Sequence, residues 1–429
     1  MKAHDYSASG NYFVTLCTLK RSLRTACALT MLAVFSCPGG AAELGGAKLG
    51  SWSGCLSLPG DWYSSAEAVR IAENVVAFQR PCGGWSKRTG FLLGTYTPEE
   101  LERALKPERT RARIHDGVGC KEHSHSSSTF DNNATTTEIR YLARVFAATG
   151  DGRFREACLR GIDYVLEAQY DNGGWPQNYP NTAQYGGHIT FNDDAMIGVM
   201  RVLEKVAIGD PRFDFIDADR RERARAAFEK GIDCIVKCQI EVGGRLTGWC
   251  QQHDATTLEP RQGRIYELPS ISGFESISIV RFLIGLEEPS PEVIAAVEGA
   301  VAWFKEVKLV GIRLEDRADP ALDRPFAVRI RENPEKPPFD YTFQGRGFDR
   351  VVIKDAAADP IWARFYEIGS NRPIFADAEG IARYRLADIS YERRVRYSWY
   401  SDLPARVLST YPNWKKRVEE SASVEARPR

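Results

Sequence analysis

A helix-ending turn that recurs along the chain limits what it can fold into. The turn occurs in AFQRPCGGW (77–85), AQYDNGGWPQNYP (168–180) and CQIEVGGRLTGW (238–249), each after an apolar-periodic helical stretch that ends in glutamine. The Gly-Gly steps begin at Gly83, Gly173 and Gly243, about 90 and 70 residues apart, which is too wide for a short solenoid repeat but suits a helix pair plus a long loop. Gly-Gly supplies the positive φ that ends a helix. The recurrence predicts a ring of paired helices with its long loops on one rim.

The N-terminal residues have the composition of a secretory signal. Basic residues up to Arg24 precede the apolar stretch 26–36, and small residues follow as far as Ala42, where we expect cleavage. The apolar stretch is too short to cross a bilayer, so no membrane anchor is expected. Residues 1–42 are therefore predicted to be a signal peptide. Residues 43–429 contain no linker or low-complexity run, which favours one catalytic domain in a secreted or periplasmic monomer.

Helical periodicity dominates the middle of the chain. Apolar residues recur at helical spacing in 135–150, 154–169, 193–207, 222–239, 274–286 and 291–307. Beyond residue 308, KLVGIRLE, FAVRIRE and DRVVIKD have the composition of short strands. The pattern predicts a mainly α protein, an α/α toroid that forms an incomplete barrel of paired helices over about 65–307, with a small β-rich subregion over 308–400.

Charge, cysteine and motif content exclude several classes of function. The 57 basic residues balance 57 acidic ones, which argues against a nucleic-acid-binding surface. Cys234 and Cys238 are best interpreted as small apolar residues on a buried helix face, because no CxxC pair is present to make a zinc site. His123 and His125 are best interpreted as part of a solvated loop. The chain has no HExxH, GxSxG, P-loop or dinucleotide-binding motif.

Three polar clusters precede the starts of predicted helices. They are TFDNNATTTE (129–138), HITFNDDAM (188–196) and GRIYELPSISGFES (263–276). If consecutive helices run up and down, these clusters and the tryptophan loops meet on one rim, as the parts of a binding site do. Asp131 and Asp193 could simply cap helices. Two carboxylates on one rim, among Asn and Thr side chains, also suit a hard cation such as Ca²⁺.

Arginine is frequent in the third cluster and in the C-terminal region. The residues concerned are Arg264, Arg346, Arg350, Arg364 and Arg372. Taken singly, each would most often be a solvated or ion-paired residue. Guanidinium groups clamp carboxylates, and Trp and Tyr rings stack on sugar rings, so the combination suits an acidic sugar polymer.

A series of motifs along about 65–400 carries a resemblance to a known family. The motifs are FQRPCGGWSK, TFDNNATTTEIRYLARVFAATGD, GIDYVLEAQYDNGGWPQNYP, HITFNDDAMI, WCQQHD, RIYELPSISGFES, WARFYEIGSNRPIF and ERRVRYSWY. In this order they resemble family 10 of the polysaccharide lyases, the pectate lyases. The resemblance implies a secreted enzyme with a largely helical α/α toroid, which cleaves polygalacturonate by calcium-dependent β-elimination.

The resemblance also implies roles for individual residues. Asp131 and Asp193 match the calcium-associated carboxylates, and Arg264 matches the arginine proposed as base. The residues implied to bind substrate are Lys87, Asn132, Arg350, Arg364 and Arg372. The first loop has GGWSK followed by Arg88, where family members often have GGWPK followed by Asn. This departure concerns the substrate contacts of that loop and leaves the chemistry unaffected.

Elimination chemistry explains why these residue types are needed. The proton at C5 of a galacturonate lies beside a carboxylate, so its removal builds up a second negative charge. Calcium on that carboxylate, with help from arginine, would stabilise the charge. Arg264 could accept the proton only when neutral, although the pKa of an arginine is usually above ~12. We expect neighbouring cations and burial to lower the pKa of Arg264, which predicts an alkaline rate optimum.

Two other functions fit parts of the pattern. Helical toroids also carry inverting glycoside hydrolases, for which Asp193 with Glu267 or Glu275 could supply two carboxyl groups about 6.5–9.5 Å apart. Such a hydrolase, acting on an acidic polysaccharide, would need no calcium and would release saturated sugars. A catalytically inactive carbohydrate-binding protein would keep the tryptophans and arginines but lose the base, and Arg264 is present. The motif residues favour the lyase.

Overall fold

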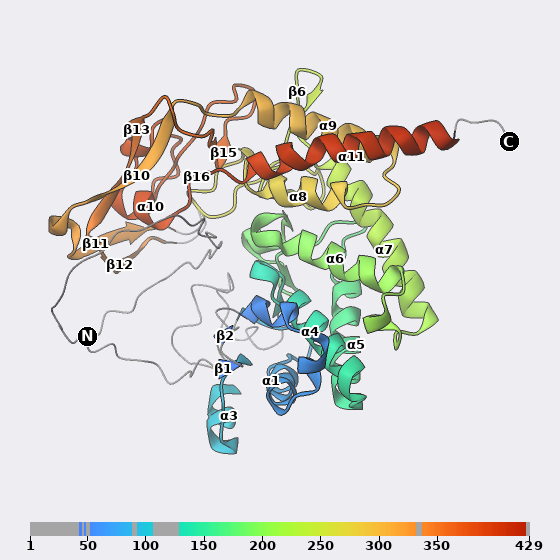
Figure 1. Cartoon of the computed structure of the whole chain (residues 1–429). Helices are drawn as coiled ribbons and strands as arrows, with labels where there is room; N and C mark the ends of the chain where they lie inside the picture. The colour runs from blue at the N-terminus through green and yellow to red at the C-terminus, as the bar shows by residue number, and fades with distance from the viewer. Residues whose placement is uncertain are drawn as a thin grey trace, which may run out of the picture.

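Helices form the main framework of the protein (Figure 1). The computed structural model describes residues 43–44, 47–48, 52–87, 92–105, 128–331 and 337–425. The α-helices are α1 (Ala66–Ala77), α3 (Pro98–Leu105), α4 (Thr136–Thr149), α5 (Gly152–Glu167), α6 (Ala195–Ala207), α7 (Ala218–Lys237), α8 (Glu275–Ile284), α9 (Pro291–Glu306), α10 (Tyr391–Arg396) and α11 (Pro404–Glu425). The prediction of a mainly α protein is confirmed. The predicted signal peptide 1–42, Arg88, His123 and His125 lie outside the described residues. Among the helices that are described, none has the length and hydropathy to cross a membrane.

Among the described residues, short strands connect the loops, and the longer strands all follow α9. The strands are β1 (Glu43–Leu44), β2 (Ala47–Lys48), β3 (Ser128–Thr129), β4 (Asn178–Tyr179), β5 (Ile189–Thr190), β6 (Glu241–Val242), β7 (Arg245–Leu246), β8 (Gln252–His253), β9 (Ile271–Ser272), β10 (Ile312–Ala318), β11 (Pro325–Ile330), β12 (Phe339–Gln344), β13 (Phe348–Lys354), β14 (Trp362–Ala363), β15 (Phe365–Tyr366) and β16 (Tyr400–Ser401). Every pairing in the described part of the chain is an antiparallel pair of two strands.

Capping side chains define where several helices begin. The carboxylate of Asp151 accepts a hydrogen bond from the N–H of Arg153 at the start of α5, and Asp217 accepts one from Arg220 at the start of α7. Ser290 caps α9, whose first residue is the proline expected at that position. The apolar stripe of each helix then packs inward, so that residues such as Leu203 of α6 have no exposed surface.

The helices pack as consecutive pairs. Helix α4 packs against α5, α6 against α7, and α8 against α9. Along the row, α6 also touches α4 and α8, and α7 touches α5 and α9, while α1 and α11 cover the two ends. Figure 1 shows this succession, from α1 near the bottom to α9 and α11 near the top. The predicted helices agree with α4 to α9 to within a few residues, whereas α3, α10 and α11 had no counterpart among the predictions.

A glutamine two residues beyond a helix end builds each recurrent turn. The side-chain Nε2 of Gln79, Gln169 and Gln239 each donates to two carbonyl groups, one within its own turn and one on another helix. The acceptors in the turns are the carbonyls of Gly83, Gly173 and Thr247, and those on the helices are Ala157, Ala227 and Ala296. The first two glycines lie against backbone, since an added Cβ would come within 2.4 Å of the Arg160 oxygen and 2.0 Å of the Lys230 oxygen.

One of the three predicted Gly-Gly positions was wrong. Gly243 lies at the tip of the β6–β7 hairpin, and the backbone equivalent of Gly83 in the third turn is Thr247. The Ile240 N–H donates to the Gly248 carbonyl, as the Arg80 N–H donates to that of Gly84. A hairpin is thus inserted inside the third turn, and Gly-Gly at a hairpin tip satisfies the same demand for positive φ.

A tryptophan follows each turn, and the structure contains a fourth copy that the sequence pattern missed. The indole Nε1 of each tryptophan donates to a backbone carbonyl two residues before the end of the preceding helix. The pairs are Trp85 with Val75, Trp175 with Val165, Trp249 with Ile235 and Trp362 with Phe304. In the fourth copy, the β10–β13 region separates α9 from its tryptophan. The described part of the chain therefore contains four repeats of the framework.

The segment after the second, third and fourth of these tryptophans pairs with a strand of the preceding repeat. Strand β4 pairs with β3, β8 with β5, and β15 with β9. The residue two positions after the tryptophan accepts a backbone bond from that repeat: Phe130 N–H to Gln177 at 2.9 Å, Phe191 N–H to Gln251 at 2.9 Å, and Gly273 N–H to Arg364 at 2.7 Å. Lys87 holds the same place after Trp85. The repeat thus aligns Lys87, Gln177, Gln251 and Arg364 along one side of the framework.

The region after α9 contains the predicted β-rich part. Strand β10 pairs with β13, and the hairpin of β11 and β12 is inserted between them in sequence. Strands β10, β11 and β13 fall where the sequence pattern placed them, whereas β12 was not predicted. Ile330, Phe365 and Trp399 form a separate small core with Tyr266, which lies beside Arg264 in sequence. This packing fixes the loop that carries Arg264.

Candidate active site

Two turns of matching shape precede α4 and α6. The turn η3 (Asp131–Asn133) contains Asn132 at φ 53° and ψ 37°, and η5 (Asn192–Asp194) contains Asp193 at φ 50° and ψ 35°. These left-handed values favour Asn and Asp over other side chains. The two turns carry their acid and amide in opposite order, Asp131–Asn132 in one and Asn192–Asp193 in the other. The amide of Asn132 therefore faces the carboxylate of Asp193 in the other turn.

Hydrogen bonds join the two turns and the first loop. The Asn132 Nδ2 donates to Asp131 Oδ1 at 2.7 Å and to Asp193 Oδ2 at 3.0 Å. The Nζ of Lys87 lies 2.9 Å from Asp131 Oδ2. The structure thus brings together four residues that the sequence singled out from three separate segments.

The two carboxylates differ in their electrostatic environment. Burial raises the pKa of Asp131, but the opposing charge and hydrogen bond of Lys87 more than offset it, so the pKa is lowered. Burial raises the pKa of Asp193, and the negative charge of Asp131 raises it further. Two carboxylates this close repel each other, and a cation between them relieves the repulsion.

Arg264 is ion-paired, which contradicts one expectation from the sequence. Its Nε donates to Glu267 Oε1 at 2.9 Å and a terminal nitrogen donates to the same oxygen, while its own N–H donates to Glu267 Oε2 at 2.8 Å. The hydroxyl of Tyr397 also donates to Glu267 Oε1, at 2.9 Å. Burial lowers the pKa of Arg264, but the negative charge of Glu267 raises it by a larger amount. The pKa of Arg264 therefore lies well above its usual value. The expected lowering of the Arg264 pKa was therefore wrong for the protein alone.

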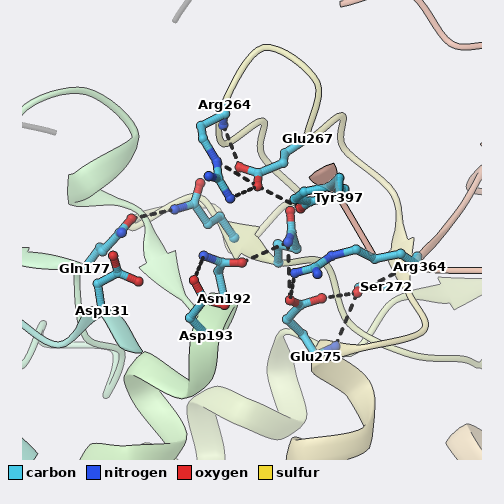
Figure 2. Close-up of polar contacts among 12 residues, drawn as sticks. Asp131, Gln177, Asn192, Asp193, Arg264, Glu267, Ser272, Glu275, Arg364 and Tyr397 are labelled. Atoms are coloured by element: carbon cyan, nitrogen blue, oxygen red, sulfur yellow. Dashed lines mark hydrogen bonds and ion pairs between the residues drawn. The ribbon is translucent and has the colours of Figure 1, made fainter. Parts of the chain in front are cut away.

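Arg364 is buried between aromatic rings and a carboxylate. A terminal nitrogen donates to Glu275 Oε1 at 2.7 Å, and the guanidinium carbon lies 4.7 Å from the ring centroids of both Phe274 and Tyr397. Burial lowers the pKa of Arg364, but the charge of Glu275 raises it overall. Its Nε has no hydrogen-bond partner among the described residues. That nitrogen is also shielded from solvent, and Figure 2 shows the guanidinium beside Glu275.

Two predicted substrate-binding arginines have their described contacts elsewhere. Arg350 makes a two-point ion pair with Asp316 across the β10–β13 ribbon, with distances of 2.7 and 2.9 Å. Arg372 is exposed, and its guanidinium lies over the ring of Tyr384 at 3.5 Å. Neither has a described contact with Asp131, Asp193 or Arg264. Their assignment to substrate stays a prediction.

Several residues of the site were not predicted. Gln177 and Gln251 were not predicted because glutamine is uncharged and did not stand out in the composition. Each follows a tryptophan by two residues, and that spacing could have identified them. Glu267 and Glu275 were considered only as the carboxyl groups of a hydrolase, yet each forms an ion pair with an arginine. Tyr397 lies far away in sequence and reaches the site through the small C-terminal core.

The buried positions of Cys234 and Cys238 agree with the sequence interpretation. The described cysteines are free thiols, and Cys234 and Cys238 are buried with their sulfurs 4.0 Å apart. Within the described ranges, no three His, Cys, Asp or Glu side chains cluster in a way that could hold a metal ion. Any cation held by Asp131 and Asp193 would need further oxygen ligands from water or substrate.

The family model described as pectic acid lyase matches residues 79–336 and 338–408. The chain belongs to the pectic acid lyase family. It is therefore a polysaccharide lyase. Among solved structures, this pectate lyase is similar to the family 10 polysaccharide lyase from Cellvibrio cellulosa, with 29% identity, a TM-score of 0.62, and coverage of 83% of this chain and 95% of that one.

A second structure of the Cellvibrio cellulosa enzyme also matches the lyase. It is an aspartate-to-alanine mutant in complex with trigalacturonic acid, at 28% identity and a TM-score of 0.61, covering 82% of this chain and 95% of that one. The search of curated proteins gives no match.

Proposed function

We propose that this lyase cleaves polygalacturonate by calcium-dependent β-elimination and releases unsaturated oligogalacturonides. The observation that carries the proposal is a cluster in which Asn132 bridges Asp131 and Asp193 and Lys87 pairs with Asp131. The positive charges of Arg264 and of the buried Arg364 act on the same site. The complex of the Cellvibrio cellulosa enzyme with trigalacturonic acid supports the choice of substrate. We further propose that residues 1–42 direct secretion. The packing of successive helix pairs supports an incomplete α/α toroid.

The residues present fit a calcium ion. Asp131 and Asp193 offer hard oxygen ligands, their mutual repulsion favours a cation, and the left-handed turns hold them on adjoining repeats. When bound there, Ca²⁺ would neutralise the substrate carboxylate and so acidify the proton at C5. Lys87 supplies the positive charge next to Asp131 when no metal is bound.

Arg364 and Arg264 have different roles in the proposed reaction. Glu275 and the ring of Tyr397 hold the guanidinium of Arg364 in a fixed plane, which suits it to a carboxylate of the sugar chain. Arg264 is our candidate base for the C5 proton. Since Glu267 raises its pKa, the neutral form is scarce in the resting protein, and cationic charge near the site would have to offset Glu267 before a proton moves. The rate should therefore increase with pH into the alkaline range.

The glycoside hydrolase alternative finds less support. A hydrolase needs a carboxylic acid that can give up a proton. Burial raises the pKa of Glu267, but the charge of Arg264 lowers it overall, so Glu267 is ionised. Glu275 accepts hydrogen bonds from Ser272, Gln251 and Arg364. Its oxygens act as acceptors in all three bonds, which does not suit the proton donor of a hydrolase.

Mass spectrometry of the products tests the proposal. Elimination gives oligogalacturonides that are lighter by one water molecule than the saturated oligomers of the same length. We expect these masses after incubation of residues 43–429 with polygalacturonate and Ca²⁺. Saturated oligomers alone would contradict the proposal and indicate hydrolysis.

A further inference from the structure

Gln251 lies at the position that the repeat shares with Lys87 and Arg364. Those two cationic side chains reach Asp131 and Glu275 respectively. Gln251 is 3% exposed and follows Trp249 by the same two residues as Arg364 follows Trp362. Its position links the second repeat, which carries Asp193, to the third, which carries Glu275.

The backbone of Gln251 holds the start of the Asp193 turn. Its carbonyl accepts hydrogen bonds from the N–H groups of Phe191 at 2.9 Å and Asn192 at 3.0 Å. Both donors come directly before Asp193. The left-handed conformation of Asp193 therefore begins from a backbone that Gln251 anchors.

The side chain of Gln251 has only one workable orientation. Its Nε2 donates to Asn192 Oδ1 at 2.9 Å and to Glu275 Oε1 at 3.2 Å. A flipped amide would turn its own oxygen toward both acceptors, and Glu275 cannot donate when ionised. Asn192 in turn donates from Nδ2 to Asp193 Oδ2 at 3.2 Å. Because Glu275 Oε1 already accepts from Arg364, each bond from Glu275 to Asp193 runs with an amide nitrogen as the donor.

Glu275 connects this chain of bonds to Arg364. The same Oε1 accepts from Arg364 at 2.7 Å, and its other oxygen accepts from the hydroxyl of Ser272. Figure 2 shows the resulting series of contacts from Asp193 through Asn192 to Glu275 and Arg364. All members other than Asp193 are less than one-tenth exposed.

We infer that Gln251 is a positioning residue that keeps the Asp193 carboxylate and the Arg364 guanidinium in fixed relation for one galacturonate segment. It acts through Asn192 on one side and Glu275 on the other, and does not itself touch the reacting atoms. The inference rests on the proposed function, because it assigns Asp193 and Arg364 to the same substrate.

The test compares Gln251→Met and Gln251→Glu with the wild type. Methionine keeps the length of the side chain but cannot donate, and glutamate places a second carboxylate against Glu275. Gln344→Met is the matched control, because Gln344 is an exposed residue of β12 that donates to Asp323. For each protein, kcat and KM on polygalacturonate, the affinity for trigalacturonic acid by calorimetry with and without Ca²⁺, and the thermal midpoint are measured.

We expect Gln251→Met to bind trigalacturonic acid about 10-fold more weakly or worse, as is usual when a supporting residue of a site is lost, and Gln251→Glu to be weaker still. KM should increase more than kcat decreases, and the control should match the wild type. Wild-type affinity and KM in both Gln251 variants would overturn the inference. A loss of affinity that is fully explained by a lower thermal midpoint would also overturn it, since Gln251 would then have only a structural role. If the wild type binds trigalacturonic acid without cleaving it, the proposed reaction fails while the binding comparison still decides the role of Gln251.

Discussion

Asn132 and Asp193 occupy the same left-handed position in two successive turns, and the amide of the first donates to the carboxylate of the second at 3.0 Å. Had both turns carried the same order of residues, two amides or two acids would face each other at this point. The exchanged order instead provides one donor for two carboxylates. This single contact joins the first two repeats at the site where we propose calcium binds.

Replacement of Asn132 separates the conformational role from the hydrogen-bonding role. In Asn132→Ala, an alanine must adopt φ 53°, which its Cβ disfavours. In Asn132→Gly, the glycine adopts that conformation without strain. We expect the alanine variant to unfold with a free energy about 1 kcal/mol lower than the glycine variant. Both should lose most lyase activity, because both lack the amide. Equal stability of the two variants in urea unfolding would contradict the strained-turn interpretation.

Asp193→Asn should have opposite effects on stability and activity. Asparagine tolerates the left-handed conformation and removes the repulsion between two buried carboxylates. We expect a higher thermal midpoint than the wild type in EDTA, together with little or no lyase activity at any Ca²⁺ concentration. A lower midpoint in EDTA would show that the carboxylate pair does not strain the metal-free protein.

Arg264→Lys should abolish turnover while leaving binding intact. A general base contributes about 100-fold or more to a rate, and lysine can still pair with Glu267. The matched control is Arg385→Lys, since Arg385 pairs with Asp388 at the same spacing of three residues on the exposed surface. We expect unchanged affinity for trigalacturonic acid in both variants and normal turnover only in the control. Substantial activity of Arg264→Lys would rule out Arg264 as the base.

Glu138 makes stability depend on pH away from the active site. Burial in the first turn of α4 raises its pKa to about 7, and one carboxylate oxygen has no hydrogen-bond partner among the described residues. A carboxyl group whose pKa is raised in the folded state stabilises the fold at low pH. That stabilisation is lost as the pH increases from the pKa of the group in the unfolded chain to its pKa of about 7 in the folded protein. Glu138→Gln should therefore stabilise the protein relative to the wild type by up to about 3 kcal/mol more at pH 8.5 than at pH 5. Denaturant unfolding at the two pH values measures this difference, and a constant difference would contradict it.

Much of the fold was accessible from the sequence because its signals are local. Helical periodicity and capping residues located α4 to α9, and the tryptophan turns revealed three repeats. The fourth repeat escaped because β10 to β13 separate α9 from Trp362. Gly243 was misplaced because glycine pairs serve hairpin tips and helix-ending turns alike.

The candidate site was predicted in part for a related reason. Asp131, Asp193 and Asn132 lie in short polar clusters whose composition stands out, so the sequence could propose that they converge. The ion pair of Arg264 with Glu267 and the stacking of Arg364 on Tyr397 depend on how the C-terminal core packs. Side-chain composition alone therefore gave the wrong direction for the pKa of Arg264.

The ultraviolet absorbance of unsaturated products tests the central claim most directly. Purified residues 43–429 are incubated with polygalacturonate at alkaline pH, first with Ca²⁺ and then with EDTA in excess. The account predicts an increase in absorbance that stops on chelation and resumes when Ca²⁺ is restored. Reducing ends that accumulate without this absorbance, or absorbance that continues in EDTA, would contradict calcium-dependent elimination at Asp131 and Asp193.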